Sequence, residues 1–249
     1  MGEIATIGLD LAKNVFQVHG IDAQGKLLVR RQLRRAEVLE FFVKIGPCLV
    51  GMEACATAHH WARQIAALGH EVRLIPPVYV KPYVKRGKTD AADAEAIVEA
   101  VTRPTMRFVA VKTADQQAAL MLHKTRDLLT RQRTALINAL RGHMGEFGII
   151  APQGAQNVAR LIEALRASGE EMPELARSAL HMLIDQLGLL EIGIRKAEAR
   201  ILAWHRANAA SRRLATIPGV GRSPRARSPR PYPTRVCSAP AGSSRPGLG

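Results

Sequence analysis

The chain of 249 residues carries 36 lysines and arginines against 21 aspartates and glutamates, so its formal net charge at pH 7 is +15. This excess predicts a polyanionic partner, DNA or RNA, with an anionic membrane as the weaker alternative. The 47% hydrophobic content excludes a wholly disordered chain, the 4% aromatic content argues against base stacking as the main mode of nucleic-acid binding, and no run of about 18 apolar residues is present to cross a membrane.

Five short segments within the first 110 residues have the apolar composition of β-strands. In the second of them, Phe16 and Val18 are predicted to face the core, with Gln17 and His19 on the opposite side. Gly25 ends a turn that lets the third strand pair back on the second. The five predicted strands are Ile4–Asp10, Asn14–Ile21, Leu27–Leu33, Cys48–Ala54 and Glu71–Ile75.

Three further segments have helical spacing, and their places in the chain set the fold class. They are Glu37–Ile45, Ala58–Leu68, which Gly69 should cap, and Asp90–Val101. The resulting order is three strands, followed by helix, strand, helix, strand and helix. This order predicts a mixed sheet with helices on both faces, the arrangement of α/β ribonuclease-H-like folds.

Residues from about 112 to 210 have a nearly continuous helical pattern with two coiled-coil seams, in which core positions recur in alternating steps of three and four. The second seam is the more apolar, so we expect it to pair tightly, either with the first helix or with another copy of the chain. The first seam consists of Ala118, Leu122, Thr125, Leu129, Gln132, Leu136 and Ala139. The second seam consists of Leu180, Leu183, Leu187, Leu190, Ile194, Ala197 and Ile201.

Basic side chains lie off the first seam and in a loop just before the helix Asp90–Val101. The helical set is either a solvated face or a face directed at nucleic acid, and the net charge favours the second interpretation. The loop, which also contains Tyr83, is either solvated or holds a phosphate. The predicted nucleic-acid-binding residues are Lys81, Lys85, Arg86 and Lys88 in the loop and Lys124, Arg126, Arg131, Arg133 and Arg141 in the helix.

Four acidic residues occupy positions that a purely structural role explains poorly. Asp10 ends the first predicted strand and Glu53 lies near the end of the fourth, while Asp90 and Asp93 share one side of a helix. Converging carboxylates repel one another unless cations neutralise them, and oxygen ligands suit Mg²⁺ or Mn²⁺. The pattern therefore predicts a two-metal site for phosphodiester transfer. The alternative is that Asp10 simply ends a strand and that the helical pair complements the helix dipole.

Three motifs resemble those of the DEDD transposases of the insertion-sequence one-ten family. They are GLDLAKN at Gly8–Asn14, GMEA at Gly51–Ala54 and KTDAADA at Lys88–Ala94, and the resemblance extends from about Ile4 to Gly221. It implies a resolvase-like (RuvC-type) N-terminal domain followed by a helical coiled-coil insert. In that domain the resemblance makes the following residues the metal ligands and catalytic groups: Asp10, Glu53, Asp90 and Asp93.

The same resemblance implies a function and a set of partners. Members of the family are bacterial mobile-element recombinases that act on DNA with a structured guide RNA, and they join DNA through a second domain that carries a nucleophilic serine. We therefore expect a cytoplasmic bacterial protein that forms a homo-oligomer through its coiled coil and does not contact a membrane. The cysteines agree with a reducing compartment, because Cys48, Cys55 and Cys237 fit no disulfide framework and no zinc site.

Residues 222–249 contain six arginines, no lysine and no acidic residue, with prolines throughout. One interpretation is a disordered basic arm. The interpretation that we favour is a frameshift near Gly221 that replaces the serine-bearing domain with an out-of-frame tail, so that this chain alone is inactive in recombination. On that interpretation none of the tail serines is the nucleophile: Ser223, Ser228, Ser238, Ser243 and Ser244.

The predicted organisation has four parts: a ribonuclease-H-like domain at 1–110, a helical coiled-coil region at 111–210, the start of a helix–hairpin–helix at 211–221 and the tail. Two other functions share many of these features. A stand-alone structure-selective nuclease would use the same metal site without a serine, and a non-catalytic remnant would bind nucleic acid as a regulator. An actin-like ATPase is disfavoured because no second phosphate loop is present.

Overall fold

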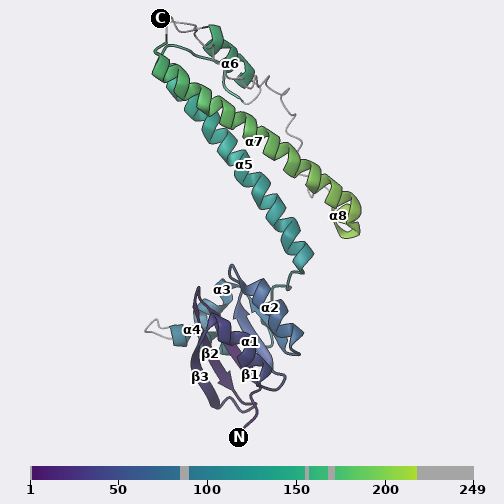
Figure 1. The fold of residues 1–249 in the computed structure, drawn as a ribbon. Helices are drawn as coiled ribbons and strands as arrows, with labels where there is room; N and C mark the ends of the chain where they lie inside the picture. The colour runs from purple at the N-terminus through teal and green to yellow at the C-terminus, as the bar shows by residue number, and fades with distance from the viewer. Residues whose placement is uncertain (1, 85–89, 155–156, 168–171, 218–249) are drawn as a thin grey trace, which may run out of the picture. The chain divides into compact units, whose positions relative to one another are not determined.

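The computed structural model describes residues 2–84, 90–154, 157–167 and 172–217. The chain divides into two compact units, Met1–Gln117 and Ala118–Gly249. Figure 1 shows a sheet with helices in the first unit and long paired helices in the second. Within the described part of the chain, no helix combines the length and the apolarity that crossing a membrane requires.

The first unit is built on one five-stranded sheet with the spatial order β3-β2-β1-β4-β5. Strands β1, β2 and β3 are antiparallel neighbours, whereas β4 pairs parallel to both β1 and β5. This confirms the predicted mixed sheet of a ribonuclease-H-like α/β fold. The strand bounds are Thr6–Leu11 for β1, Val15–Ile21 for β2, Leu27–Arg34 for β3, Leu49–Glu53 for β4 and Glu71–Ile75 for β5.

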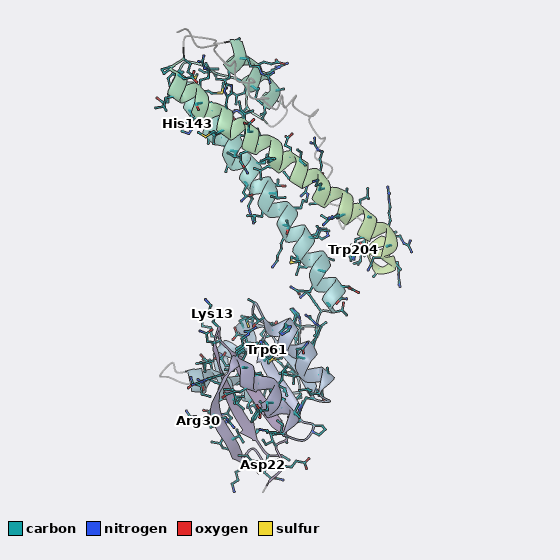
Figure 2. All side chains as sticks on the ribbon, in the orientation of Figure 1. Lys13, Asp22, Arg30, Trp61, His143 and Trp204 are labelled. Carbon is teal, nitrogen blue, oxygen red and sulfur yellow. The ribbon has the colours of Figure 1, made fainter. Side chains whose placement is uncertain are left out.

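Helices cover both faces of this sheet, as the element order predicts. On one face Phe16 and Val18 are buried, and Trp61 packs edge-on against Phe16 inside the unit (Figure 2). On the other face Ile97 and Val101 pack with Ile75 in a second cluster. The helices are η1 (Arg35–Glu37), α1 (Val38–Val43), α2 (Ala58–Ala67), α3 (Pro77–Val80), η2 (Lys81–Tyr83) and α4 (Asp90–Val101).

The second unit is helical, and its two longest helices pair along their lengths (Figure 1). Arg126 of α5 donates to Glu198 of α7, and a Cβ at Gly193 of α7 would lie 3.3 Å from Leu129 of α5. At one end of the pair, α6 completes a core that includes Met144, Leu161 and Leu180. The helices are α5 (Ala114–Gly145), α6 (Val158–Ala167), α7 (Glu174–Ala207) and α8 (Ala209–Leu214).

One of the two predicted seams is confirmed and the other needs correction. On α7 the predicted positions Leu180, Leu187, Leu190, Ile194 and Ala197 are all buried. On α5 the leucines of the predicted seam are half-buried, but the assignment of the intervening positions is wrong. Polar seam positions at residues 125 and 132 are exposed, and the residues that follow each of them, 126 and 133, are half-buried instead. Both of these are arginines, whose long apolar stems can pack like apolar side chains. Arg126 donates to Glu198 of α7, and Arg133 acts electrostatically on Glu191 of the same helix.

Candidate functional site

The register of two parallel strands brings Asp10 and Glu53 together. Gly8 of β1 is aligned with Gly51 of β4, and Leu9 with Met52, so the next step along both strands aligns Asp10 with Glu53. Because neighbouring parallel strands lie about 4.8 Å apart, both carboxylates occupy the same edge of the sheet. Both residues are half-buried.

The side-chain alternation of a strand fixes the face on which these two acids lie. Asp10 is two residues after Gly8, and Glu53 is two residues after Gly51, so all four positions share one face. A Cβ at Gly8 would collide with the carbonyl oxygen of Ala94, and a Cβ at Gly51 would lie 2.9 Å from the Cβ of Val101. Helix α4 therefore lies directly on this face, and only glycine leaves room for its backbone.

Helix α4 contributes the third acid. Asp93 immediately precedes Ala94, whose carbonyl touches Gly8, and it is half-buried. Burial raises the pKa of Glu53, and the negative charge of Asp93 raises it further. Glu53 and Asp93 are therefore close enough to repel each other. Asp90 begins α4, one turn earlier, and its side chain lies outside the described residues.

The donor set fits a hard divalent cation. All of the predicted ligands are carboxylates, which Mg²⁺ and Mn²⁺ prefer. Within the described residues, no three acidic, histidine or cysteine side chains already meet in a metal-holding group. The raised pKa of Glu53 shows that its anionic form is unfavourable in this setting, and a cation placed among these acids would remove that penalty.

The predicted basic loop is described only at its start. Lys81 begins η2 and is exposed, and Tyr83 ends it half-buried. Lys85, Arg86 and Lys88 lie outside the described residues.

The basic residues predicted on α5 divide into two groups. Lys124 and Arg131 are exposed to solvent. The other three have partners or charged neighbours within the helical unit. Arg126 is only 13% exposed and donates to Glu198. Arg133 acts electrostatically on Glu191, and Arg141 donates to the carbonyl oxygens of Pro152 and Gly154.

Comparison with known proteins gives one family and a set of close relatives. A family model described as a transposase, of the IS110 DEDD type, matches residues 7–149. "Probable family 20 transposase" of Pseudomonas aeruginosa is 50% identical over 220 residues, which are 88% of this chain and 65% of the relative. "Putative transposase y4pF/y4sB" of Sinorhizobium fredii is 48% identical over 88% of this chain and 56% of its own length. "Transposase for insertion sequence element IS1328" of Yersinia enterocolitica is 40% identical over 89% and 66%.

Proposed function

Because this chain belongs to the IS110-type DEDD transposase family, we propose that its N-terminal unit is the metal-dependent catalytic part of a bacterial DNA transposase. The observation that carries the proposal is the register that aligns Asp10 with Glu53 beneath the helix that holds Asp93. The proposed metal ligands and catalytic residues are Asp10, Glu53, Asp90 and Asp93, and the proposed ion is Mg²⁺ or Mn²⁺.

In the proposed chemistry, two strands and one helix supply the acids. When bound, two such ions stabilise charge on the attacking and leaving oxygens of a phosphodiester. The strand ends supply Asp10 and Glu53, which share one sheet edge, and α4 supplies Asp90 and Asp93 from the layer above. The exposed ammonium group of Lys81 is suited to hold a phosphate of the nucleic-acid backbone, and we propose the same role for the basic residues that follow it in the sequence.

Metal binding by the full chain tests the proposal. In calorimetric titrations with Mn²⁺, Asp10→Asn and Glu53→Gln are each expected to weaken binding about tenfold or more, because each removes an anionic ligand. Both variants should also melt at a higher temperature than the parent without metal, because repulsion among the acids is relieved. The matched control is Glu71→Gln, since Glu71 is exposed at the start of β5. Unchanged metal affinity and unchanged melting in both site variants would contradict the assignment.

The proposed partners are nucleic acids. The family resemblance points to the element ends, the target DNA and a structured guide RNA, and the +15 charge of the chain supports polyanion binding. The residues proposed for the backbone contacts are Lys81, Lys85, Arg86 and Lys88, which precede α4 in the sequence, and Lys124 and Arg131 on α5. The remaining predicted contacts, Arg126, Arg133 and Arg141, engage groups of the helical unit itself.

A homo-oligomer through the helical unit is also proposed. Leu175, Met182 and Leu189 of α7 recur at heptad spacing and are 85%, 65% and 63% exposed. They form an exposed apolar stripe on α7 outside the seam, and such a stripe suits a further helix. Sedimentation of the parent and of Met182→Asp tests this proposal, with a smaller mass expected for the variant.

The chain spans 56% to 66% of the length of the relatives described above, so the recombination activity of a complete family member is a separate proposal. We propose that residues 222–249, with their arginine-rich and acid-free composition, are an out-of-frame substitute for a family segment. The test supplies cognate element ends and guide RNA to this chain and to a version with the frame restored after Gly221. Recombination is expected only with the restored version, and Asp90→Ala should abolish it. Equal recombination by the present chain would overturn this proposal.

A further inference from the structure

A pocket apart from the four acids lies in the first unit, between the α3–η2 segment and the residues that follow α4. Its volume is about 290 Å³, close to the lower end of the roughly 300–1,000 Å³ of small-ligand sites. It is therefore sized for a single small ring system with its substituents. The lining residues are Tyr79, Pro82, Tyr83, Arg103, Thr105, Met106 and Arg107.

One wall of this pocket is formed by tyrosines, a rare residue type in this chain. The chain has three tyrosines, and two of them, Tyr79 and Tyr83, line the pocket. Tyr79 remains 40% exposed, so part of its side chain is open to a ligand. Any nucleobase can stack on such a ring, because every base has a flat aromatic face.

Two arginines also line the pocket. The guanidinium carbon of Arg103 lies 5.6 Å from the centre of the Tyr83 ring, and an ion pair with Glu99 holds that arginine in position. Arg107 and Thr105 are exposed. The seven described lining residues include no acid, so the rim is suited to an anionic group next to the aromatic wall.

We propose that this pocket binds one unpaired nucleotide of a nucleic-acid strand, with the base stacked on Tyr79 and the adjoining phosphate on Arg107. The inference rests on the proposed nucleic-acid partners, and it adds a recognition site that is independent of the four acids. A stacked base is a contact that duplex regions cannot make, because their bases are already stacked on one another. The pocket therefore selects single-stranded segments over paired ones.

The first test measures binding of fluorescent, unstructured oligonucleotides to the full chain in the presence of EDTA, with one RNA series and one DNA series. Tyr79→Ala is expected to weaken binding by about 5- to 100-fold, whereas Tyr79→Phe keeps the ring and should bind like the parent. The matched control is Val78→Ala, because Val78 is the preceding residue and is 66% exposed. The series with the larger loss identifies the strand that the pocket holds.

The second test separates stacking from charge. Arg107→Gln should reduce the slope of log affinity against log salt by about 0.7, as expected for the loss of one single-strand phosphate contact. Tyr79→Ala should lower affinity without changing that slope. When the unmodified chain binds an oligonucleotide that contains 2-aminopurine, the fluorescence of that base should change. An oligonucleotide with an abasic residue at the position that responds should bind more weakly, by the same factor as Tyr79→Ala weakens binding.

The outcomes distinguish this inference from the proposed function. If Tyr79→Ala, Tyr79→Phe and the parent bind equally and 2-aminopurine gives no response, the inference fails while nucleic-acid binding by the chain stands. If Tyr79→Phe loses as much affinity as Tyr79→Ala, stacking is not the interaction. If the unmodified chain binds no nucleic acid at low salt, the proposed partners fail as well. The 2-aminopurine measurement requires no variant, so it decides even if Tyr79→Ala does not fold.

Discussion

The single hydrogen atom of a glycine side chain sets the distance between sheet and helix in the first unit. Any larger residue at Gly8 would collide with the backbone of α4 at Ala94, and backbone cannot move aside as a side-chain end can. Since Asp93 immediately precedes Ala94, the position of this acid relative to Asp10 and Glu53 depends on the same contact.

Gly8→Ala is expected to lower the free energy of unfolding by about 2 kcal/mol or more, because overpacking at a backbone contact forces α4 outward. Urea unfolding measures this, and titration with Mn²⁺ should show weaker binding in the folded variant. Gly142→Ala is the control, since no atom lies within 4 Å of a Cβ there and alanine favours a helix by up to about 1 kcal/mol. Equal stability of Gly8→Ala and the parent would contradict the close approach of α4.

A buried cysteine–histidine contact gives a second prediction at this scale. The backbone N–H of Cys48 donates to Nδ1 of His70, which leaves the Nε2–H of that ring to donate to the carbonyl of Phe42 at 3.0 Å. Burial raises the pKa of the Cys48 thiol to about 11.

Iodoacetamide at pH 8 should therefore modify Cys48 only slowly in the folded chain. At that pH only about one in a thousand Cys48 thiols is ionised, and the sulfur is buried. Cys55 is half-buried and should react sooner. Mass spectrometry of the two peptides measures both rates, and adding urea provides the control in which the difference disappears. Modification of Cys48 as fast as Cys55 in the folded protein would exclude this environment.

Charged residues of α5 and α7 interact across the helix pair of the second unit. Arg126 of α5 bonds Glu198 of α7, and one heptad further along α5 Arg133 acts on Glu191, one heptad back along α7. The two arginine–glutamate combinations thus repeat with the antiparallel register. A slip of either helix by one turn would leave these groups without their partners, so they specify the alignment as well as supporting it.

A double-mutant cycle on Arg126→Met and Glu198→Met tests this arrangement. Each single change leaves one charge near the seam without its partner, so the double variant should be more stable than the sum of the single effects by about 0.5–3 kcal/mol. Urea unfolding followed by helical circular dichroism gives the three values. The exposed pair Arg177 and Glu174 within α7 is the comparison, and its coupling should not exceed about 1 kcal/mol. Additive effects for Arg126 and Glu198 would remove their role in alignment.

Glu191 makes the stability of the helical unit depend on pH. Burial raises the pKa of Glu191, although Arg133 and Arg195 act in the opposite direction. The folded chain therefore takes up this proton at a higher pH than the unfolded chain. Glu191 therefore lowers the free energy of unfolding progressively as the pH rises from its pKa in the unfolded chain to its higher pKa in the folded chain. Above the folded-state pKa this contribution no longer changes with pH.

The stability of Glu191→Gln relative to the parent should therefore increase as the pH rises from 5 to 7.5. Thermal melting at the two pH values measures the difference, with the exposed Glu174→Gln as the control. A difference between Glu191→Gln and the parent that is the same at both pH values would show that Glu191 keeps its ordinary ionisation in the fold.

The elements differ in how far the sequence could predict them. The helix Asp90–Val101 and the strand Glu71–Ile75 have the predicted bounds, because proline or a clear change of periodicity marks their ends. The predicted seam of α5 is wrong at residues 125 and 132 because hydropathy counts arginine as polar, whereas the stem of an arginine can pack like an apolar side chain. The pocket at Tyr79 escaped prediction because its walls come from segments separated by the whole of α4. Convergence of the four acids remains a prediction, supported by the register of Asp10 with Glu53 and the effect of Asp93 on Glu53.

At the scale of the whole molecule, the positive charge should control the strength of nucleic-acid binding. Replacing Lys124 and Arg131 by Gln is expected to reduce the slope of log affinity against log salt by about 1.4 to 1.8, as for the loss of two phosphate contacts. Filter binding from 50 to 300 mM salt measures the slope. The control is Lys196→Gln with Arg200→Gln, which removes two exposed charges from α7. An equal reduction in both double variants would assign the effect to net charge rather than to α5.

The close contact of α4 with the two strand glycines has a consequence for how the protein is made. During synthesis β1 and β4 emerge first, and they can align Asp10 with Glu53 as soon as the sheet forms. The proposed acids of α4 can reach them only after the ribosome has released the rest of that helix, since a Cβ at Gly51 would lie 2.9 Å from Val101 at the end of α4. A nascent chain that stops before α4 thus has a sheet without the complete set of proposed ligands. On the proposed assignment, the four acids therefore come together only when α4 has docked on the sheet.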